Sequence, residues 1–535
     1  MPGDRRVGAS HAHWLVMHGA RSAMLVARDV WPAWLIVSIL VLYGFGWALP
    51  DGRYLDGSFH ADENATVRAI GRISFPSFKT DYLSWGTALF YEIHALKVVA
   101  SWVGGVDFDD RAMFVLGRGL VYAYALGVVT VLYLLARDLF GRGTAVLAAL
   151  LLAVSPGFVI SSHYLKVDVP MTFWLLLACL LACRLVAGTS SRVWALGLAT
   201  GLAASTKYGA ALFVVPGAVA VAIAPIRDRA RAMAVFAGLV AVGFLAGTPY
   251  ALLDPGGLYE ALRVDVELRD PDPFILEGPL PPVDYAVNVL PYALTVPVLL
   301  LAVAGLVLAV RRHARPLLPV LLFLVLYAGL LSVDRAPYVR ATAPVLPFAA
   351  LFAAYALTRL WGRRALRFAA IAGSAAVVGY AFTFSLAYVQ AFGAVDPRVR
   401  AAMWIEEQVP RDAVIATSSA HYLELPKLWM IGRRGTEVAF DPGALESLEP
   451  DYLIVSDMHE AVGRHPSEER FFAHVRSRFC EAARFENSQR LGGIDAKPGE
   501  RRLSYDSLLP NPRVTILARR EPGSPCRPSA AQSAP

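Results

Sequence analysis

Long, nearly uncharged apolar stretches recur through most of this chain, and they constrain its fold more than any other feature. Each stretch approaches the roughly 20 residues that a helix needs to cross a bilayer. The chain of 535 residues is 56% hydrophobic and only 17% charged. This composition is too apolar for a soluble protein of such length. The sequence therefore predicts a polytopic, all-α membrane protein.

The apolar stretches predict about eleven membrane-spanning helices. They are expected near residues 31–49, 113–135, 144–160, 169–187, 193–206, 209–225, 232–249, 289–310, 316–333, 338–360 and 366–388. After the last of them the composition changes to that of a soluble segment. We therefore divide the chain into a cytoplasmic N-terminal segment (1–30), a transmembrane domain (31–390), a C-terminal domain (391–522) and a disordered tail (523–535).

The arginines gather in alternate loops between these stretches. The arginine-rich loops contain Arg137, Arg142, Arg184, Arg192, Arg227, Arg229, Arg231, Arg311, Arg312, Arg315, Arg363, Arg364 and Arg367. By the positive-inside rule these loops are cytoplasmic, together with the N-terminus. An odd number of spans then places the C-terminal domain outside, in a multi-pass protein of the inner (plasma) membrane. The net charge of +7 belongs to these anchors, so nucleic acid is not an expected partner.

The largest outer loop, residues 50–110, contains two adjacent carboxylates, Asp62 and Glu63, just after the first span. Acidic groups are costly to place beside a membrane, so their presence indicates a function. The alternative is that the pair only begins a helix, where acidic residues are favourable.

Later outer loops add a segment from His163 to Asp168, then Lys207, and then Arg340. These loops bring carboxylates, imidazoles and cations to one face of the membrane. Such a set suits glycosyl transfer, which needs a base for the acceptor proton and cations for a departing phosphate. Asp62 or Glu63 would be the base, and Lys207 and Arg340 would contact the phosphate.

Several of these residues also have simpler interpretations. Asp168 could cap the fourth span with Pro170 in its first turn. Lys207 could extend from a span end to the lipid head groups. The imidazoles of His60 and His163 could be ordinary hydrogen-bonded groups at the interface, or, with Glu63, ligands of a divalent metal ion.

Four segments resemble the dolichyl-phosphate-mannose protein mannosyltransferase superfamily, whose bacterial members include the aminoarabinose transferases of lipid A. They are the Asp-Glu pair at residues 62–63, His-Tyr-Leu-Lys-Val-Asp-Val-Pro-Met at 163–171, Ala-Ser-Thr-Lys-Tyr-Gly at 204–209, and Thr-Pro-Tyr-Ala-Leu-Leu-Asp-Pro at 248–255. The resemblance extends over residues 30–390, and the order of the segments carries it more than any one of them.

This resemblance implies a C-type membrane glycosyltransferase fold with about eleven transmembrane helices. The enzyme would be a hexosyl or pentosyl transferase that uses a polyprenyl-phosphate-linked sugar and acts at the outer face. Asp62 would be the base beside Glu63, Asp168 the second acid, and Lys207 the contact to the lipid phosphate. Relatives have Arg-Tyr followed by spaced prolines in a late loop, whereas this chain has Tyr338-Val339-Arg340, which leaves the role of Arg340 less defined.

The expected partners are therefore a lipid-linked sugar donor, a hydroxyl acceptor on a lipid, glycan or protein, and membrane lipids. Tyr164 and Tyr208, which neighbour the polar residues of the second and third loops, join His163 as expected substrate contacts. The alternative is a polytopic secondary transporter. It should carry its ionisable residues at mid-bilayer on broken helices, whereas these acids lie at span ends.

The C-terminal domain contains apolar runs at 413–417 and 451–456 and helical residues near 466–479, which predict a small extracytoplasmic α/β domain. Cys480 and Cys526 both fall on this side, where a disulfide between them is chemically permitted. The long polar loop from Asp254 to Asn288 is a candidate for a mobile cover over the acceptor.

Overall fold

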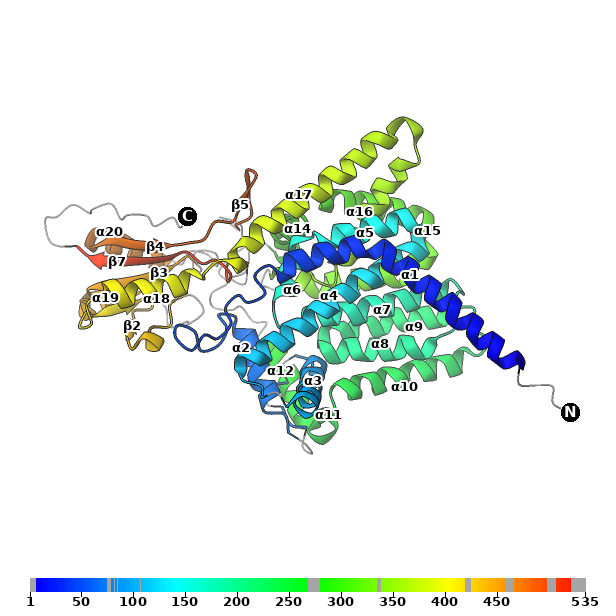
Figure 1. Cartoon of the computed structure of the whole chain (residues 1–535), viewed down its shortest axis with the longest axis horizontal. Coiled ribbons are helices and arrows are strands. Elements are labelled where there is room, and N and C mark those ends of the chain that lie inside the picture. Colours follow the sequence, from blue (N-terminus) through cyan, green and yellow to red (C-terminus); the bar gives the residue numbers. More distant parts are fainter. Residues whose placement is uncertain are drawn as a thin grey trace.

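The computed structural model describes residues 6–74, 78–80, 82–83, 85–105, 107–267, 280–333, 338–418, 425–457, 466–497 and 507–520. A body of packed helices carries a small sheet domain at one end, and the long helix α17 (Arg367–Gly393) runs from that body toward the sheet (Figure 1). Within the loop 254–288, which was expected to cover the acceptor, residues 268–279 lie outside the described residues, between α12 (Pro255–Glu267) and α13 (Pro281–Asp284).

Among the described residues, six helices are long and apolar enough to cross a membrane: Ala23–Leu42, which is part of α1 (Arg6–Leu42), α4 (Asp110–Phe140), α7 (Asp168–Val186), α10 (Arg229–Gly247), α15 (Val296–Leu331) and the run Arg364–Gln408. The bent pair α5 (Arg142–Ala153) and α6 (Pro156–His163) forms a seventh if counted as one span. Three shorter apolar helices also occur among the described residues: α8 (Val193–Thr206), η1–α9 (Tyr208–Ile223) and α16 (Leu346–Trp361). The polytopic, all-α fold is confirmed, while the count of about eleven spans stays a prediction.

Element α15 covers two of the expected spans, for which an arginine-rich connection at residues 311–315 was expected. His313, whose φ is −135°, has a non-helical backbone, and two helices meet there across a kink. Pro316 and Pro319 follow the kink, and each lacks the N–H that a helix interior uses. The polar connection is therefore a kink between two helices rather than a longer loop.

Helices α8 and α10 pack closely because glycines lie where they meet. A Cβ atom added to Gly201 would lie 2.2 Å from the carbonyl oxygen of Val240, and one on Gly243 would lie 2.6 Å from that of Leu198. Small residues allow helix backbones to approach in this way within a membrane. This contact holds α8, and α8 ends at Thr206 directly before Lys207.

The sheet domain begins with α18 (Pro397–Gln408) and contains a five-stranded sheet of order β2-β1-β3-β7-β4. Its strands are β1 (Ile415–Thr417), β2 (Gly435–Glu437), β3 (Tyr452–Ser456), β4 (Phe479–Phe485) and β7 (Val514–Arg519). Strand β1 is parallel to β2 and β3, and β7 is antiparallel to β3 and β4. The remaining helices are η5 (Leu428–Ile431), α19 (Pro442–Leu448) and α20 (Pro466–Arg478). The predicted strands at 413–417 and 451–456 and the helix near 466–479 are confirmed.

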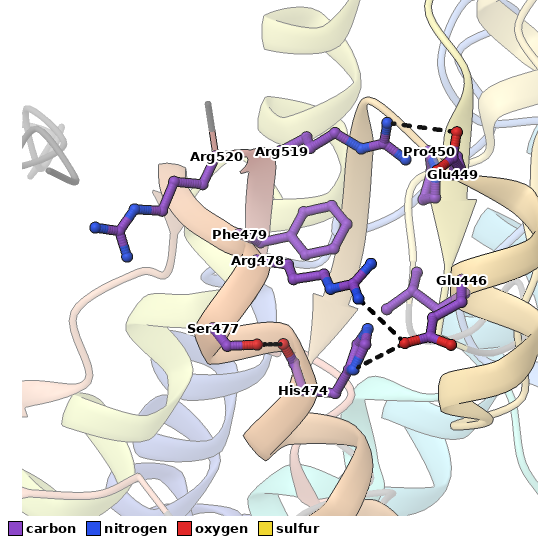
Figure 2. A pocket seen from close by; sticks show the side chains of 10 residues that line it. Glu446, Glu449, Pro450, His474, Ser477, Arg478, Phe479, Arg519 and Arg520 are labelled. Atoms are coloured by element: carbon purple, nitrogen blue, oxygen red, sulfur yellow. Dashed lines mark hydrogen bonds and ion pairs between the residues drawn. The ribbon is translucent and has the colours of Figure 1, made fainter. Parts of the chain in front are cut away.

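Cys480, in β4, is disulfide-bonded. Cys526 lies outside the described residues, so the pairing of these two cysteines stays a prediction. A hollow beside the start of β4 is lined by His474 and Arg478, and both side chains pair with Glu446 of α19 (Figure 2). These contacts tie α19 to α20.

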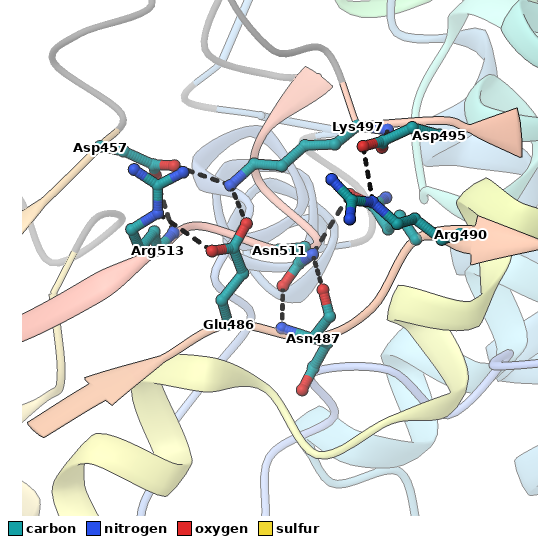
Figure 3. A network of polar contacts seen from close by, with 9 residues as sticks. Asp457, Glu486, Asn487, Arg490, Asp495, Lys497, Asn511 and Arg513 are labelled. Atoms are coloured by element: carbon teal, nitrogen blue, oxygen red, sulfur yellow. Dashed lines mark hydrogen bonds and ion pairs between the residues drawn. The ribbon is translucent and has the colours of Figure 1, made fainter. Parts of the chain in front are cut away.

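A polar network fixes the hairpin of β5 (Arg490–Leu491) and β6 (Ile494–Asp495) to the rest of the sheet domain (Figure 3). Lys497 Nζ contacts Asp457, at 2.9 Å, and Glu486, which also accepts from Arg513 Nε at 3.0 Å. The helical body holds the same region from the other side, since Tyr292 donates a hydrogen bond to the carbonyl of Ala496. The sheet domain is thus packed directly against the helices.

Candidate functional site

The polar loop residues meet in a small cavity at the end of the helical body that carries the sheet domain. It is lined by His60, Ile160, Ser161, Tyr164, Lys166, Asp168, Val339, Arg340 and Ser507. We call this the basic cavity. Its walls come from the start of α2 (Ala61–Gly71), the turn between α6 and α7, η3 (Val339–Thr342) and the sheet domain.

Asp62 lies in the first turn of α2, where its carboxylate meets two cations. Oδ2 lies 2.5 Å from Lys166 Nζ and 3.5 Å from Arg340 Nη1, and the side chain is 19% exposed. Burial opposes ionisation of this carboxyl, but the charges of Lys166 and Arg340 outweigh it and hold its pKa well below its usual range. Asp62 is therefore ionised and in reach of solvent, so it can accept a proton, although its low pKa makes it a weaker base than an ordinary carboxylate.

His60 is the N-cap of α2. Its Nδ1 accepts a hydrogen bond from the backbone N–H of Asp62 at 3.2 Å, so the neutral ring carries its proton on Nε2. Burial, together with the positive charge of Lys166, lowers the pKa of His60 to about 3. This imidazole is neutral and holds the backbone beside Asp62 in place.

Glu63 is fully buried and its two oxygens are already occupied. Arg118 of α4 binds them through Nε and Nη2 at 2.8 and 2.7 Å. Ser58 Oγ donates to Oε2 at 2.7 Å, and the backbone N–H of Leu165 donates to Oε1 at 2.8 Å. Burial opposes its ionisation, yet Arg118 lowers its pKa below the usual range. Glu63 therefore links α2, α4 and the turn that carries Lys166.

Asp168 is the first residue of α7 and is almost completely buried. Its Oδ1 lies 2.7 Å from Nζ of Lys207, which directly follows α8 and whose side chain is 31% exposed. Asp62 and Asp168 are thus each paired with a lysine. Around them Lys166, Lys207 and Arg340 outnumber the two carboxylates, so the cluster carries an excess positive charge that suits an anion.

Three of the expected substrate contacts do not line the basic cavity: His163, Tyr208 and Lys207, the last of which pairs with the lining residue Asp168. His163 hydrogen-bonds to the carbonyls of Val159 and Tyr43 and stacks on Phe392, with ring centroids 4.1 Å apart. Tyr208 begins η1 and lies against Phe244. By contrast, Tyr164 lines the cavity and contacts the edge of the His60 ring.

Three residues of this region were missed from the sequence. Lys166 pairs with Asp62, Arg118 pairs with Glu63, and Ser507 brings the sheet domain into the cavity wall. Arg118 lies within a predicted apolar span, and a charge inside a membrane needs a partner. Its pairing with a carboxylate of the first outer loop could therefore have been predicted. No comparable signal identifies Ser507, whose position depends on how the domains pack.

Whether His60 and Glu63 could bind a metal ion depends on which of their donor atoms already make hydrogen bonds. Glu63 has both oxygens engaged by Arg118, Ser58 and Leu165, and His60 Nδ1 is used as a helix cap. In the described part of the chain, no three His, Cys, Asp or Glu side chains gather as a ligand set. The two side chains therefore do not fit the expected metal site.

Comparisons with known proteins agree with this architecture. Residues 118–252 match the family model described as dolichyl-phosphate-mannose-protein mannosyltransferase. No curated protein sequence matches the chain. Among solved structures, the apo oligosaccharyltransferase of Archaeoglobus fulgidus is similar, with a TM-score of 0.51 and 14% identity over 86% of this chain and 73% of that one. The chain has the fold of the C-type membrane glycosyltransferases.

Other solved structures also match. The Archaeoglobus fulgidus oligosaccharyltransferase in complex with Zn and sulfate has a TM-score of 0.50 and 14% identity, over 86% of this chain and 72% of that one. ArnT from Cupriavidus metallidurans bound to undecaprenyl phosphate has a TM-score of 0.46 and 14% identity, over 90% and 97% of the two chains. The C-type fold and the resemblance to the mannosyltransferase superfamily are confirmed, the latter over residues 118–252.

Proposed function

We propose that this protein is an integral-membrane glycosyltransferase that moves a sugar from a polyprenyl-phosphate donor to a hydroxyl acceptor. The observation that carries the proposal is the ionised Asp62, which pairs with Lys166 and Arg340, two cations that line the basic cavity. The C-type fold and the family match at residues 118–252 support the same chemistry. The acids lie at helix starts rather than inside broken helices, which disfavours the transporter alternative.

In the proposed reaction the acceptor oxygen attacks the anomeric carbon of the donor sugar. The bond between that carbon and the phosphate oxygen breaks, and polyprenyl phosphate leaves with the bonding electrons. Asp62 takes the proton of the acceptor hydroxyl. Lys207 and Arg340 receive the negative charge of the departing phosphate, and Lys166, which sequence analysis missed, joins them. Inversion at the anomeric carbon is implied by the family resemblance alone.

The other expected site residues receive supporting roles. Asp168 orients Lys207, and Glu63 holds the turn that presents Lys166. Tyr164 would contact the substrate from the cavity wall. His163 and Tyr208, whose contacts are with neighbouring helices, would act through packing.

We further propose that the basic cavity and the sheet domain lie outside an inner (plasma) membrane, with the N-terminus in the cytoplasm. Helix α4 supports this orientation. It begins at Asp110, which lines a hollow beside α2, and passes Asp138, which pairs with Arg184 in the last turn of α7. About 42 Å of helix separates these ends, enough to place them on opposite sides of a bilayer. The boundaries 31–390 and 391–522 remain our proposal for the two domains.

The charge on the departing phosphate is balanced, in this proposal, by lysine and arginine rather than by the divalent metal expected from the sequence. Nδ1 of His60 and both carboxylate oxygens of Glu63 are already used, and three cations lie close together instead. We expect the transfer rate to be unchanged after EDTA treatment of the purified protein. A loss of transfer that Mg²⁺ or Mn²⁺ restores would show that a metal takes part.

The proposed function is tested with purified protein in nanodiscs, radiolabelled polyprenyl-phosphate sugars and a membrane-lipid extract as acceptor. Binding of the lipid phosphate is measured separately with unlabelled polyprenyl phosphate. Transfer of label into the extract supports the proposal. Protein that binds no polyprenyl phosphate and transfers no sugar, but moves label across a vesicle membrane, would instead be a transporter.

Lys166 should set the pH range in which Asp62 can act. In Lys166→Met the nearest positive charge is lost while burial still opposes ionisation, so the pKa of Asp62 rises. The acidic limb of the kcat/KM profile should then move to higher pH. Lys166→Arg keeps the charge and serves as the control. An acidic limb that stays in place in Lys166→Met would contradict the assignment of Asp62 as the titrating base.

A further inference from the structure

A second hollow lies on the other side of α2, between that helix, the start of α4 and η5 of the sheet domain. The residues that matter here are Asp56, Arg68, Gly71, Asp110, Lys427 and Trp429. We call this hollow the Trp429 groove. Gly71 lies nine positions after Asp62, which at 100° per residue places it on the opposite face of α2. The groove is therefore separate from the basic cavity.

Trp429 presents an open but fixed aromatic surface in this groove. The side chain is 55% exposed, although its indole N–H donates to Asp56 Oδ2 at 3.2 Å. The other oxygen of Asp56 lies 2.5 Å from Nζ of Lys427, which is buried beneath. An exposed tryptophan is costly in water, and holding it in one orientation lowers the entropy lost when a ligand stacks on it. The arrangement indicates a preformed binding surface.

The rim of the groove offers one hydrogen-bond donor group and one acceptor group. Arg68 and Asp110 are both exposed, and within the described residues neither makes an ion pair. Together with the pair of Lys427 and Asp56, the groove contains equal numbers of positive and negative groups. A phosphate or another anion would find no net attraction here, whereas a neutral ligand with many hydroxyl groups could use both ends of the rim.

We infer that the Trp429 groove binds a neutral saccharide unit of the acceptor, which makes the acceptor a glycan or glycan-bearing molecule. A sugar ring has an apolar face for the indole and hydroxyl groups for Arg68 and Asp110. This inference rests on the proposed function. Asp56 lines the Trp429 groove, and Asp62 pairs with Lys166 of the basic cavity. Because the two residues are six positions apart in the chain, their Cα atoms lie at most about 20 Å apart. An acceptor held in the groove can thus extend around the start of α2 to Asp62.

Gly71 provides a way to fill the groove without disturbing its walls. A Cβ atom at this position would meet no other atom within 4 Å, and Gly71 is the last residue of α2. In Gly71→Phe the added ring should occupy the space in front of Trp429. Gly71→Ala adds only a methyl group and is the matched control. Trp429→Ala removes the stacking surface, and Trp429→Phe restores an aromatic ring.

The test uses the full chain in detergent, fluorescently labelled, on an array of neutral and anionic oligosaccharides. We expect the wild type to bind neutral members of the array. Gly71→Phe and Trp429→Ala should lose about tenfold or more in affinity, as the loss of an aromatic contact of about 1.4 kcal/mol predicts. Gly71→Ala and Trp429→Phe should retain most of the binding.

Polyprenyl-phosphate binding is measured on the same proteins and should be equal in all of them, because the donor is assigned to the basic cavity. The inference is overturned if no neutral glycan binds, if only anionic glycans bind, or if Gly71→Phe binds as well as the wild type. Glycan binding without polyprenyl-phosphate binding would contradict the proposed function and leave the groove assignment intact. Binding of polyprenyl phosphate without binding of any glycan would leave the proposed function intact and overturn the groove assignment.

Discussion

Sugar transfer should fall about 10³-fold when Asp62 is replaced by asparagine, because general-base catalysis contributes about 10²- to 10⁴-fold. Asparagine has nearly the same shape but cannot accept the acceptor proton. The measurement is single-turnover transfer from a radiolabelled polyprenyl-phosphate sugar in nanodiscs. Binding of polyprenyl phosphate should change little, because the cations that receive the phosphate remain in place.

The same substitution also leaves Lys166 without its nearest counter-charge, since the Asp62 carboxylate lies 2.5 Å from Nζ. A structural effect of this kind would mimic a catalytic one. The double variant Asp62→Asn/Lys166→Met removes both charges and is compared with Lys166→Met, because Lys166 is itself assigned to the phosphate. If Asp62 is the base, the double variant transfers sugar much more slowly than Lys166→Met. Equal transfer rates in these two variants would mean that Asp62 acts only as the partner of Lys166.

The helical fold was predictable because its signal is local. Apolar stretches of the sequence identify the membrane spans directly. A polar residue at one end of a span can then be assigned to one face of the membrane. This is how Asp62, Asp168, Lys207 and Arg340 could be assigned to one region, and the structure brings all four together. The arginine-rich connection expected at residues 311–315 coincides with the break at His313, where two helices meet across a kink.

The pairing of charges could not be derived from the sequence. Adjacent residues Asp62 and Glu63 were given similar roles, but successive residues on a helix differ in direction by about 100°. One carboxylate consequently meets Lys166 beside the cavity, and the other meets Arg118 in the interior. Ser507 and Trp429 were missed for a different reason. Each reaches its position through the packing of the sheet domain on the helices, which no local pattern encodes.

Removing the charge of Arg118 should destabilise the protein by about 3–5 kcal/mol, because a buried carboxylate is left unpaired. In Arg118→Met, Glu63 keeps only the hydroxyl of Ser58 and the N–H of Leu165. The free energy of unfolding is measured by titration from mild detergent into SDS. A loss below about 1 kcal/mol, the range of exposed ion pairs, would contradict the buried pair.

The double variant Glu63→Leu/Arg118→Met then distinguishes stability from positioning. Replacing both charges by apolar groups should recover much of the lost stability. It cannot restore the acceptor for the Leu165 N–H, which holds the turn carrying Lys166. We therefore expect a folded protein whose transfer remains impaired and whose acidic limb moves to higher pH, as in Lys166→Met. Full recovery of transfer would show that Glu63 only balances the charge of Arg118.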